Sequence, residues 1–259
     1  MTYNVIGLMS GTSLDGTDLA YCQLKYEKNT WSYQILAAKT YKYSKDWIKR
    51  LKNAEDSSAL EFIKTDSDLG LYFGNRINQF ISDFKLDKNK IEAIASHGHT
   101  IFHQPDLGFS TQIGNGSQIC AISGLKTIVD FRSIDVALNG QGAPLVPIGD
   151  LLLFNDYDNC LNLGGIANIS CQKGGQRIAK DITFANMIGN YLCEEINLEF
   201  DDKGAIASSG KIDNQMLELL NNITNHKKLK NKSLGKETFN NYIKPFLQES
   251  TISVEDKLH

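Results

Sequence analysis

The residues with the clearest capacity for chemistry lie near the start of the chain, where an apolar run at residues 5–8 leads into a polar loop. The loop members are Gly11, Thr12, Ser13, Leu14, Asp15, Gly16, Thr17 and Asp18. Glycine lets the backbone approach an anion closely, and successive N–H groups form an anion-binding nest. A nearby carboxylate can hold the Mg²⁺ that accompanies a nucleoside triphosphate. The pattern predicts a phosphate-binding hairpin, and a tight turn between packed strands is the simpler alternative.

A second glycine turn follows the same plan later in the chain. Residues 159–170 are predicted to form a strand, a turn at Gly164 and Gly165, and another strand. Two such hairpins, separated by a long segment of mixed strands and helices, indicate two lobes of related topology. For this turn, too, the alternative is a structural one, a tight connection between packed strands.

Three histidines lie close together at His97, His99 and His103. Residues i and i+2 of a strand share a face, so two of the imidazoles could bind zinc. No His-Glu-x-x-His pattern or cysteine partner follows, and no metal site is predicted. The favoured interpretation is a polar strand end at which His99 and Thr100 form hydrogen bonds with ligand hydroxyls.

Arg132 and Asp135 follow a predicted strand that ends at Asp130. A guanidinium can grip a carboxylate with two parallel hydrogen bonds, so Arg132 is a candidate for binding an acidic ligand. A structural ion pair with a neighbouring acid is the alternative. The glycine-rich loop at residues 140–144 needs unusual backbone angles and serves as either a hinge or a wall of the site.

Composition limits the classes of protein. The 259 residues are 41% hydrophobic and 22% charged, with a net charge of −3, which predicts a globular protein without a nucleic-acid surface. The basic run at residues 227–232 is interpreted as a solvated loop. Five scattered cysteines without a Cys-x-x-Cys pair, and no signal peptide or membrane span, predict a cytoplasmic protein with reduced thiols.

The elements that must position these residues follow from hydrophobic periodicity and capping signals. Strands are predicted at residues 4–8, 19–25 and 31–43, then at 91–96, 110–113 and 127–130. Helices are predicted at residues 44–53, from 57 to about 81, at 117–125 and up to about 154. Further helices are predicted after the second hairpin, at residues 184–196, 213–222 and 235–248.

Taken together, these blocks resemble the anhydro-N-acetylmuramic acid kinase family, within the sugar-kinase and actin-like ATPase superfamily. The matching blocks are GLMSGTSLDGTD at 7–18, SHGHTIFHQP at 96–105, QIGNG at 112–116, DFRSIDVALNGQGAPLVP at 130–147, NLGGIANIS at 162–170 and DITFAN at 181–186. The resemblance implies an α/β, two-lobed actin-like ATPase (ribonuclease H-like) fold with an incomplete second lobe. The implied lobes are residues 1–155 and 156–259.

The resemblance also implies an activity and roles for the candidate residues. Such enzymes use ATP, Mg²⁺ and water to open the ring of 1,6-anhydro-N-acetylmuramic acid and phosphorylate its O6. Residues 11–18, Gly164 and Gly165 would bind the phosphates. Asp181 would be the general base, although its position before a predicted helix also fits an N-cap. Arg132 and Asp135 would lie at the sugar with His99 and Thr100, Arg132 facing the lactyl carboxylate.

Two departures from the family pattern matter. Residues 181–186 lack the glycines found in many relatives, and roughly the last quarter to third of the family's length does not follow His259. An incomplete second sheet would leave an unpaired edge, so we expect the 259-residue chain to aggregate or to form a homodimer, to bind ATP weakly and to show little or no kinase activity. A non-catalytic remnant that binds only sugar or phosphate is the alternative function, and a histidine-based metallohydrolase is a third. The expected partners are the sugar and ATP, without nucleic acid or membrane.

Overall fold

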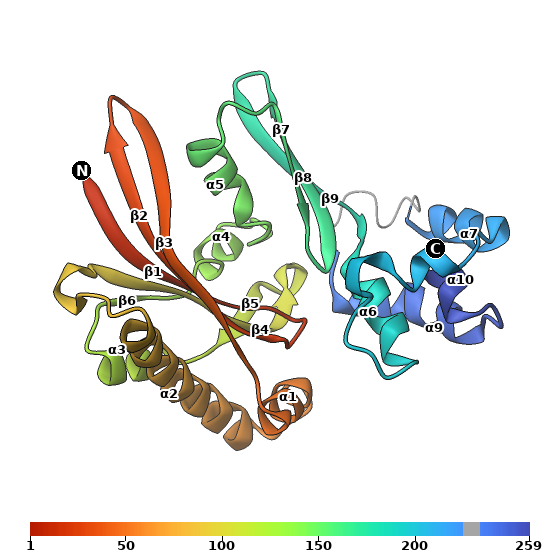
Figure 1. Cartoon of the computed structure of the whole chain (residues 1–259), viewed down its shortest axis with the longest axis horizontal. Coiled ribbons are helices and arrows are strands. Elements are labelled where there is room, and N and C mark those ends of the chain that lie inside the picture. Colours follow the sequence, from red (N-terminus) through yellow and green to blue (C-terminus); the bar gives the residue numbers. More distant parts are fainter. Residues whose placement is uncertain (225–233) are drawn as a thin grey trace. The chain divides into compact units, whose positions relative to one another are not determined.

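A computed structural model describes residues 1–224 and 234–259, and the basic run predicted as a solvated loop lies outside these residues. The chain divides into two compact units, Met1–Leu153 and Phe154–His259, each described by itself. Both combine strands with helices (Figure 1). The α/β class predicted from the sequence is therefore confirmed.

The first unit is built on a mixed sheet. Three long antiparallel strands form a meander, β1 (Thr2–Ser10), β2 (Gly16–Glu27) and β3 (Thr30–Lys42). They join β4 (Ala93–Gln104) and β5 (Phe109–Ile113) in the order β3-β2-β1-β4-β5, and the short β6 (Thr127–Ile128) also pairs with β4. The β1–β4 and β4–β6 pairs are parallel and the others antiparallel.

Two helices between β3 and β4 begin at serine caps. Ser44 accepts a hydrogen bond from Trp47 N at the start of α1 (Lys45–Lys52). Ser58 and Glu61 form a capping box at the start of α2 (Ala59–Asp83), which satisfies two backbone donors that the helix leaves unpaired. The sequence predicted both starts, because serine is a preferred N-cap residue.

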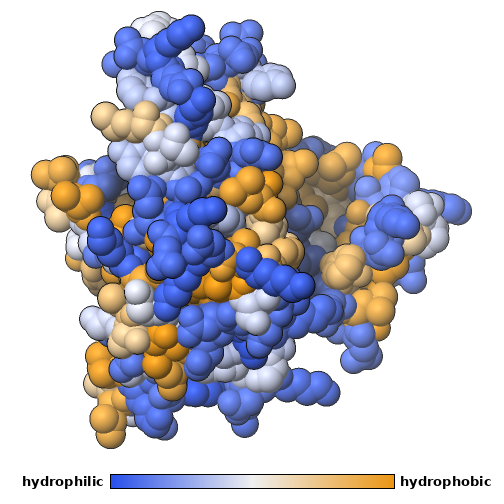
Figure 2. All heavy atoms as spheres, turned by 60° about the vertical axis from the view of Figure 1, so that its left-hand side comes forward, coloured by the Kyte–Doolittle hydropathy of each residue, from blue (hydrophilic) through white to orange (hydrophobic). Residues whose placement is uncertain are grey.

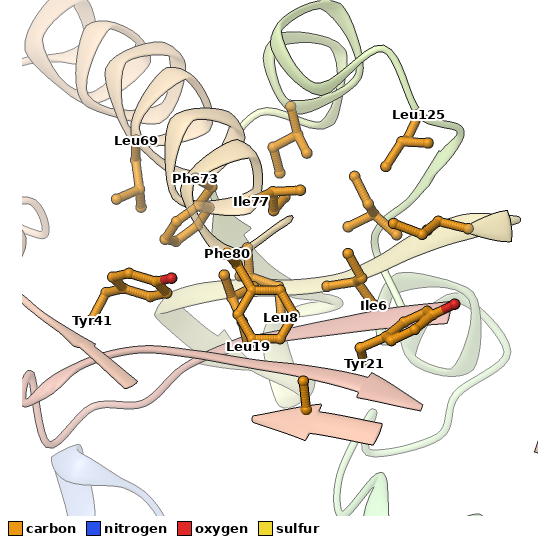
Figure 3. Packing of buried hydrophobic residues seen from close by; sticks show 14 of the residues in the cluster. Ile6, Leu8, Leu19, Tyr21, Tyr41, Leu69, Phe73, Ile77, Phe80 and Leu125 are labelled. Atoms are coloured by element: carbon orange, nitrogen blue, oxygen red, sulfur yellow. The ribbon is translucent and has the colours of Figure 1, made fainter. Parts of the chain in front are cut away.

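The core of the first unit lies between α2 and one face of the sheet. Side chains from α2, including Leu69, Phe73, Ile77 and Phe80, point toward Ile6 and the neighbouring strands (Figure 3). All five are fully buried. Their spacing of three to four residues places them on one face of α2, and the burial of such apolar side chains is the main favourable term in folding.

Shorter elements complete the first unit. They are η1 (Lys88–Lys90), η2 (Pro105–Leu107), α3 (Gly116–Ser123), α4 (Ser133–Ala137) and α5 (Val146–Leu153). Asn115 caps α3, which packs beside α2 at Gly74, where an added Cβ would lie 2.7 Å from Ile122 Cβ. The close approach of these two helices therefore depends on the missing side chain.

The second unit contains an antiparallel sheet in the order β7-β8-β9, formed by β7 (Asn159–Leu163), β8 (Ile166–Lys173) and β9 (Gln176–Phe184). Its helical segments are α6 (Asn186–Glu194), η3 (Asp202–Gly204), η4 (Ala207–Ser209), α7 (Asn214–Thr224), α8 (Lys236–Thr238), the π-helical η5 (Phe239–Ile243), α9 (Lys244–Glu249) and α10 (Val254–Leu258). Leu192, Ile243 and Leu247 are fully buried in its separate core.

Two sequence expectations about these elements need correction. The strand predicted at residues 91–96 continues to Gln104 as β4, because its polar end pairs with β5. The helix predicted at residues 235–248 is instead three consecutive segments with a π-helical middle. Within the described ranges, no helix combines the length and apolar content needed to cross a bilayer.

Candidate functional site

The first polar loop connects two buried strand ends. Ser10 ends β1 and Gly16 begins β2, so residues 11–15 form the connection. Leu14 donates its backbone N–H to the Gly11 carbonyl at 3.2 Å, which closes a tight turn. Leu14 has φ 59°, a left-handed conformation that non-glycine residues seldom adopt. The hydroxyl-bearing Thr12 and Ser13 are exposed, and a ligand can reach them.

Acidic side chains lie on either side of this turn. Ser13 Oγ donates to Asp15 Oδ1 at 2.7 Å, and Thr40 Oγ1 donates to Asp18 Oδ1 at 2.5 Å. Both carboxylates are exposed. Exposed hydroxyls and backbone N–H groups can donate hydrogen bonds to a phosphate, and carboxylate oxygens can ligate the Mg²⁺ that accompanies it. The residues of this loop therefore fit a phosphate together with Mg²⁺. Among the described residues, no group of three or more His, Cys, Asp or Glu side chains is placed so that it could hold a metal ion.

Glycine at position 16 is required by packing. A Cβ built there would lie 2.6 Å from the Tyr41 carbonyl oxygen on β3, closer than real Cβ atoms come to backbone. Gly16 is therefore needed to bring β2 against β3 where the loop ends.

A buried hydrogen-bonded group lies directly behind the loop. Ser10 Oγ is 2.7 Å from Tyr43 Oη and 2.9 Å from His99 Nδ1. Ser10 is 1% exposed, His99 3% and Tyr43 7%. The role of His99 at a sugar stays a prediction, and the contact that the structure describes is the one with Ser10. Neither Ser10 nor Tyr43 was identified from the sequence as a member of the site. The available signal was that Ser10, a polar residue, ends the strand of alternating buried apolar residues that forms β1.

An irregularity in β4 separates His97 from His99. The β1–β4 register pairs Leu8 with Ser96 but Ser10 with His99, so β4 carries an extra residue there. Gly98 lies in this bulge with φ 72°. As a result His99 joins the buried group at Ser10, whereas His97 bonds Arg132. The expectation that the two imidazoles share one face is wrong, because the bulge breaks the alternation on which it rested.

Arg132 forms a half-buried group with His97. Its Nε and Nη2 lie 3.2 and 2.9 Å from His97 Nε2, and its Nη1 donates to the Gly142 carbonyl at 2.6 Å. Burial, and then the nearby Arg132 charge, lower the pKa of His97 below its usual value of 6.5. His97 is therefore neutral at pH 7 and accepts at Nε2. Arg132 thus contacts an imidazole and a backbone carbonyl, and the alternative of a structural ion pair with an acid stays a prediction.

Asp135 holds the glycine-rich loop that follows α4. Its Oδ2 accepts the Gly142 N–H at 2.6 Å, and its backbone carbonyl accepts the Gly140 N–H at 2.7 Å. Gly142 has φ 63°, and a Cβ at Gly140 would overlap the Asp135 carboxylate. Arg132 and Asp135 thus both grip Gly142, one at its carbonyl and one at its N–H. Whether either side chain also contacts a sugar stays a prediction.

An open groove of about 610 Å³ lies on the face of this sheet away from α2. Its lining includes the small residues Ala20, Ala38 and Ala95, together with Asp18 and His97. The groove therefore connects the end of the first loop with the His97–Arg132 pair. Thr100 pairs with Gln112 of β5 further along β4.

The second glycine turn joins β7 to β8 in the other unit. The Gly165 carbonyl accepts the N–H groups of Ala185 and Met187 at 2.9 and 3.1 Å, and the Gly164 carbonyl accepts that of Asn186 at 3.2 Å. These donors lie at the start of α6, so the turn is bonded to that helix. Neither glycine has a positive φ, and an added Cβ would find no atom within 3.6 Å. Backbone strain therefore does not explain the two glycines.

Asp181 lies within β9 and belongs to a polar row across the sheet. The register pairs Asn162 with Asn168 and Asn168 with Asp181, so the three side chains share one face. Asp181 Oδ2 accepts the Leu234 N–H at 2.8 Å. Helix α6 begins five residues later with Ala185 at its cap, so the predicted alternative of an N-cap role is wrong. The two asparagines were missed, although their alternate spacing about the turn was visible in the sequence.

Comparison with known proteins gives one consistent family. The family profile described as "Anhydro-N-acetylmuramic acid kinase" matches residues 3–257. A protein of that name from Shewanella amazonensis is 36% identical over 247 residues, which cover 91% of this chain and 66% of the relative. Another, from Pseudoalteromonas translucida, is 36% identical over 236 residues, covering 83% of this chain and 59% of the relative.

The chain thus spans slightly less than two thirds of the length of these relatives. Among solved structures, the ethanolamine utilization protein EutJ from Carboxydothermus hydrogenoformans aligns with a TM-score of 0.33 and 12% identity. That alignment covers 80% of this chain and 61% of EutJ. A score at this level supports no argument about the site.

Proposed function

The chain belongs to the anhydro-N-acetylmuramic acid kinase family, and we propose that it opens and phosphorylates the 1,6-anhydro sugar for which that family is named. The observation that carries the proposal is the first loop. It presents two exposed hydroxyls and two exposed carboxylates at the ends of buried strands, within a chain that matches the kinase family over residues 3–257.

Residues 11–18 take the role of binding the ATP phosphates in this proposal. Backbone N–H groups and the hydroxyls of Thr12 and Ser13 donate to phosphate oxygens, because successive donors on a turn favour an anion. Gly164 and Gly165 are proposed as the second phosphate turn. Asp15 and Asp18 would hold Mg²⁺, which when bound neutralises charge on the triphosphate.

Asp181 takes the role of general base. Its carboxylate accepts a proton from a water molecule, and the resulting hydroxide equivalent bonds to the anomeric carbon of the sugar. The bond between that carbon and O6 breaks, and O6 attacks the γ-phosphate and releases ADP. The Leu234 N–H holds Oδ2 at 2.8 Å, so one carboxylate oxygen is fixed in position. Orientation of this kind is what a general base needs.

Arg132, Asp135, His99 and Thr100 are proposed to orient the sugar. The guanidinium of Arg132 suits a carboxylate such as the lactyl group of the muramic sugar. Asp135 and Arg132 both hydrogen-bond the backbone of Gly142, so both hold the glycine-rich loop in place. We further propose a cytoplasmic location with ATP and the sugar as partners. The five cysteines, all of which are unpaired, are consistent with a reducing compartment.

The experiment is an assay of ATP-dependent ring opening by the purified chain, with Asp181→Asn as the test variant. Relative to the chain without the substitution, we expect a loss of about 10²–10⁴-fold in kcat for the variant and unchanged sugar affinity, because only proton removal is lost. Asp156→Asn is the matched control, since Asp156 is exposed and precedes β7.

Two results would contradict the proposal. A wild-type chain that binds sugar or phosphate without turnover would favour the non-catalytic alternative. A variant that retains more than about a tenth of the wild-type rate would show that another group activates the water.

A further inference from the structure

The buried hydroxyl of Ser10 connects the ends of β1 and β3 with the interior of β4, immediately behind the first loop. Ser10 is the last residue of β1 and directly precedes Gly11. Tyr43 follows the last residue of β3, and His99 lies on β4. The two contacts at Ser10 Oγ, at 2.7 and 2.9 Å, thus tie the root of the loop to strands on both sides of β1.

The two contacts together fix the Ser10 side chain. A serine hydroxyl has one proton to donate and two lone pairs, so it can donate to one partner while accepting from the other. Burial raises the pKa of Tyr43 to about 12, so its hydroxyl keeps its proton and can serve as donor.

Tyr43 is itself held by an aromatic stack. Its ring centroid lies 5.6 Å from that of Tyr72 on α2, and the Tyr72 ring lies 5.3 Å from that of Trp47 on α1. Such tilted pairs at 4.5–7 Å are favourable and restrict ring rotation. This packing against α1 and α2 holds the Tyr43 hydroxyl at Ser10. The position of the loop therefore depends on the position of the two helices.

We propose that Tyr43 is a positioning residue for nucleotide binding, which acts through Ser10 to hold residues 11–16 in the conformation that receives the phosphates. The inference rests on the proposed function of this loop as the ATP phosphate site. A nest of N–H groups binds an anion well only if the groups already point to one place, because ordering them on binding costs free energy. Neither Tyr43 nor Ser10 touches the nucleotide in this role.

The test uses Tyr43→Phe in the full chain, which removes the hydroxyl and keeps the ring. We expect faster amide hydrogen exchange at residues 11–16 and a dissociation constant for Mg-ATP about 2–10-fold weaker, the effect of one lost hydrogen bond. Tyr41→Phe is the matched control. Tyr41 lies two residues earlier, is buried to the same degree, and donates its hydroxyl to Asp83 at 2.7 Å instead.

A double-mutant cycle shows whether Tyr43 acts through Ser10. Ser10→Ala removes both hydrogen bonds at Ser10, so adding Tyr43→Phe should change loop exchange and Mg-ATP affinity less than Tyr43→Phe does alone. Additive effects of the two substitutions would overturn the inference, because they would mean that Tyr43 stabilises the fold by a separate route.

The remaining outcomes separate this inference from the proposed function. Unchanged exchange at residues 11–16 in Tyr43→Phe, or the same increase in Tyr41→Phe, overturns the inference. Faster exchange with unchanged Mg-ATP affinity also overturns it. A wild-type chain that binds no Mg-ATP contradicts the proposed function. In that case, amide hydrogen exchange at residues 11–16 in the double-mutant cycle is the measurement that tests whether Tyr43 positions the loop.

Discussion

At the scale of single residues, Arg132 makes the most side-chain hydrogen bonds among the residues proposed to orient the sugar. Its guanidinium donates hydrogen bonds to His97 and to the Gly142 carbonyl, so some of its N–H groups are already paired within the first unit. A guanidinium carries five N–H donors, and these contacts do not exhaust them. The arginine can therefore hold the loop and still present donors to a carboxylate.

We predict that Arg132→Ala raises KM for the anhydro-muramic sugar more than KM for ATP. The lost charge-assisted hydrogen bonds to the lactyl carboxylate are worth about 1.5–3 kcal/mol. The measurement is steady-state kinetics with both sugars, the second being the anhydro-glucosamine analogue that lacks the carboxylate. Equal weakening for the two sugars would show that Arg132 only supports the loop at Gly142.

His97 gives the first unit a pH dependence. Its pKa in the folded state is lowered by burial and by Arg132, so the unfolded chain binds a proton at His97 more readily than the folded one. We therefore predict that the free energy of unfolding falls as the pH drops below 6.5, the usual value. Above that pH the contribution of His97 is constant.

Urea unfolding at a series of pH values measures this dependence. His97→Gln keeps an acceptor for Arg132 but does not titrate, so its stability should fall less steeply below pH 6.5 than that of the wild type. His259→Gln, at the exposed end of the chain, is the control. Identical slopes for wild type and His97→Gln would show that His97 does not contribute.

At the scale of elements, the bulge in β4 decides where two histidines point. Gly98 occupies it with φ 72°, and an added Cβ would lie 2.6 Å from the Ile113 carbonyl oxygen on β5. Both backbone conformation and packing therefore require glycine. The bulge directs His99 to Ser10 and His97 to Arg132, so one backbone irregularity supplies two different groups.

Gly98→Ala should destabilise the first unit by more than the roughly 1–2 kcal/mol of a left-handed non-glycine residue, because a backbone clash adds to the strain. Gly108→Ala separates the two effects, since Gly108 has φ 83° and an added Cβ would find no atom within 4 Å. Chemical denaturation of both variants gives the comparison. A Gly98→Ala loss no larger than that of Gly108→Ala would mean that β5 moves away without cost.

At the scale of the whole molecule, apolar side chains remain at the surface, and Figure 2 shows several such patches on the face it presents. In the second unit, β7 pairs only with β8 among the described strands. Its Leu161 and Leu163 are 58% and 62% exposed. An exposed strand edge with apolar side chains is a template for pairing with another chain.

We predict that the chain self-associates through β7. Sedimentation velocity should show a concentration-dependent dimer, and Leu161→Lys with Leu163→Lys should return it to monomer, because a charged edge resists pairing. Ile63→Lys is the control, since Ile63 on α2 of the first unit is 63% exposed. A wild-type monomer at every concentration, or a dimer that persists in the lysine variant, would contradict the prediction.

The sequence determined the elements and the loops that carry the candidate residues. Serine caps and apolar spacing predicted α1 and α2, and runs of apolar, aromatic and β-branched residues predicted the first three strands. The polar residues after the first strand predicted the first loop. The six sequence blocks, taken together, carried the resemblance to the kinase family. These signals are local in the chain, so they can be read without knowledge of tertiary contacts.

Only the tertiary structure decided which side chains meet. The pairing of Ser10 with Tyr43 and His99 joins residues 33 and 89 positions apart, and the Arg132–His97 contact joins residues 35 positions apart. The β4 bulge reversed the expected direction of one histidine, because a single extra residue shifts every later side chain to the other face. Asp181 likewise lies inside a strand rather than at a helix cap, because pairing with β8 extends β9 to Phe184. Such pairings depend on register between distant segments, and local sequence patterns do not encode that register.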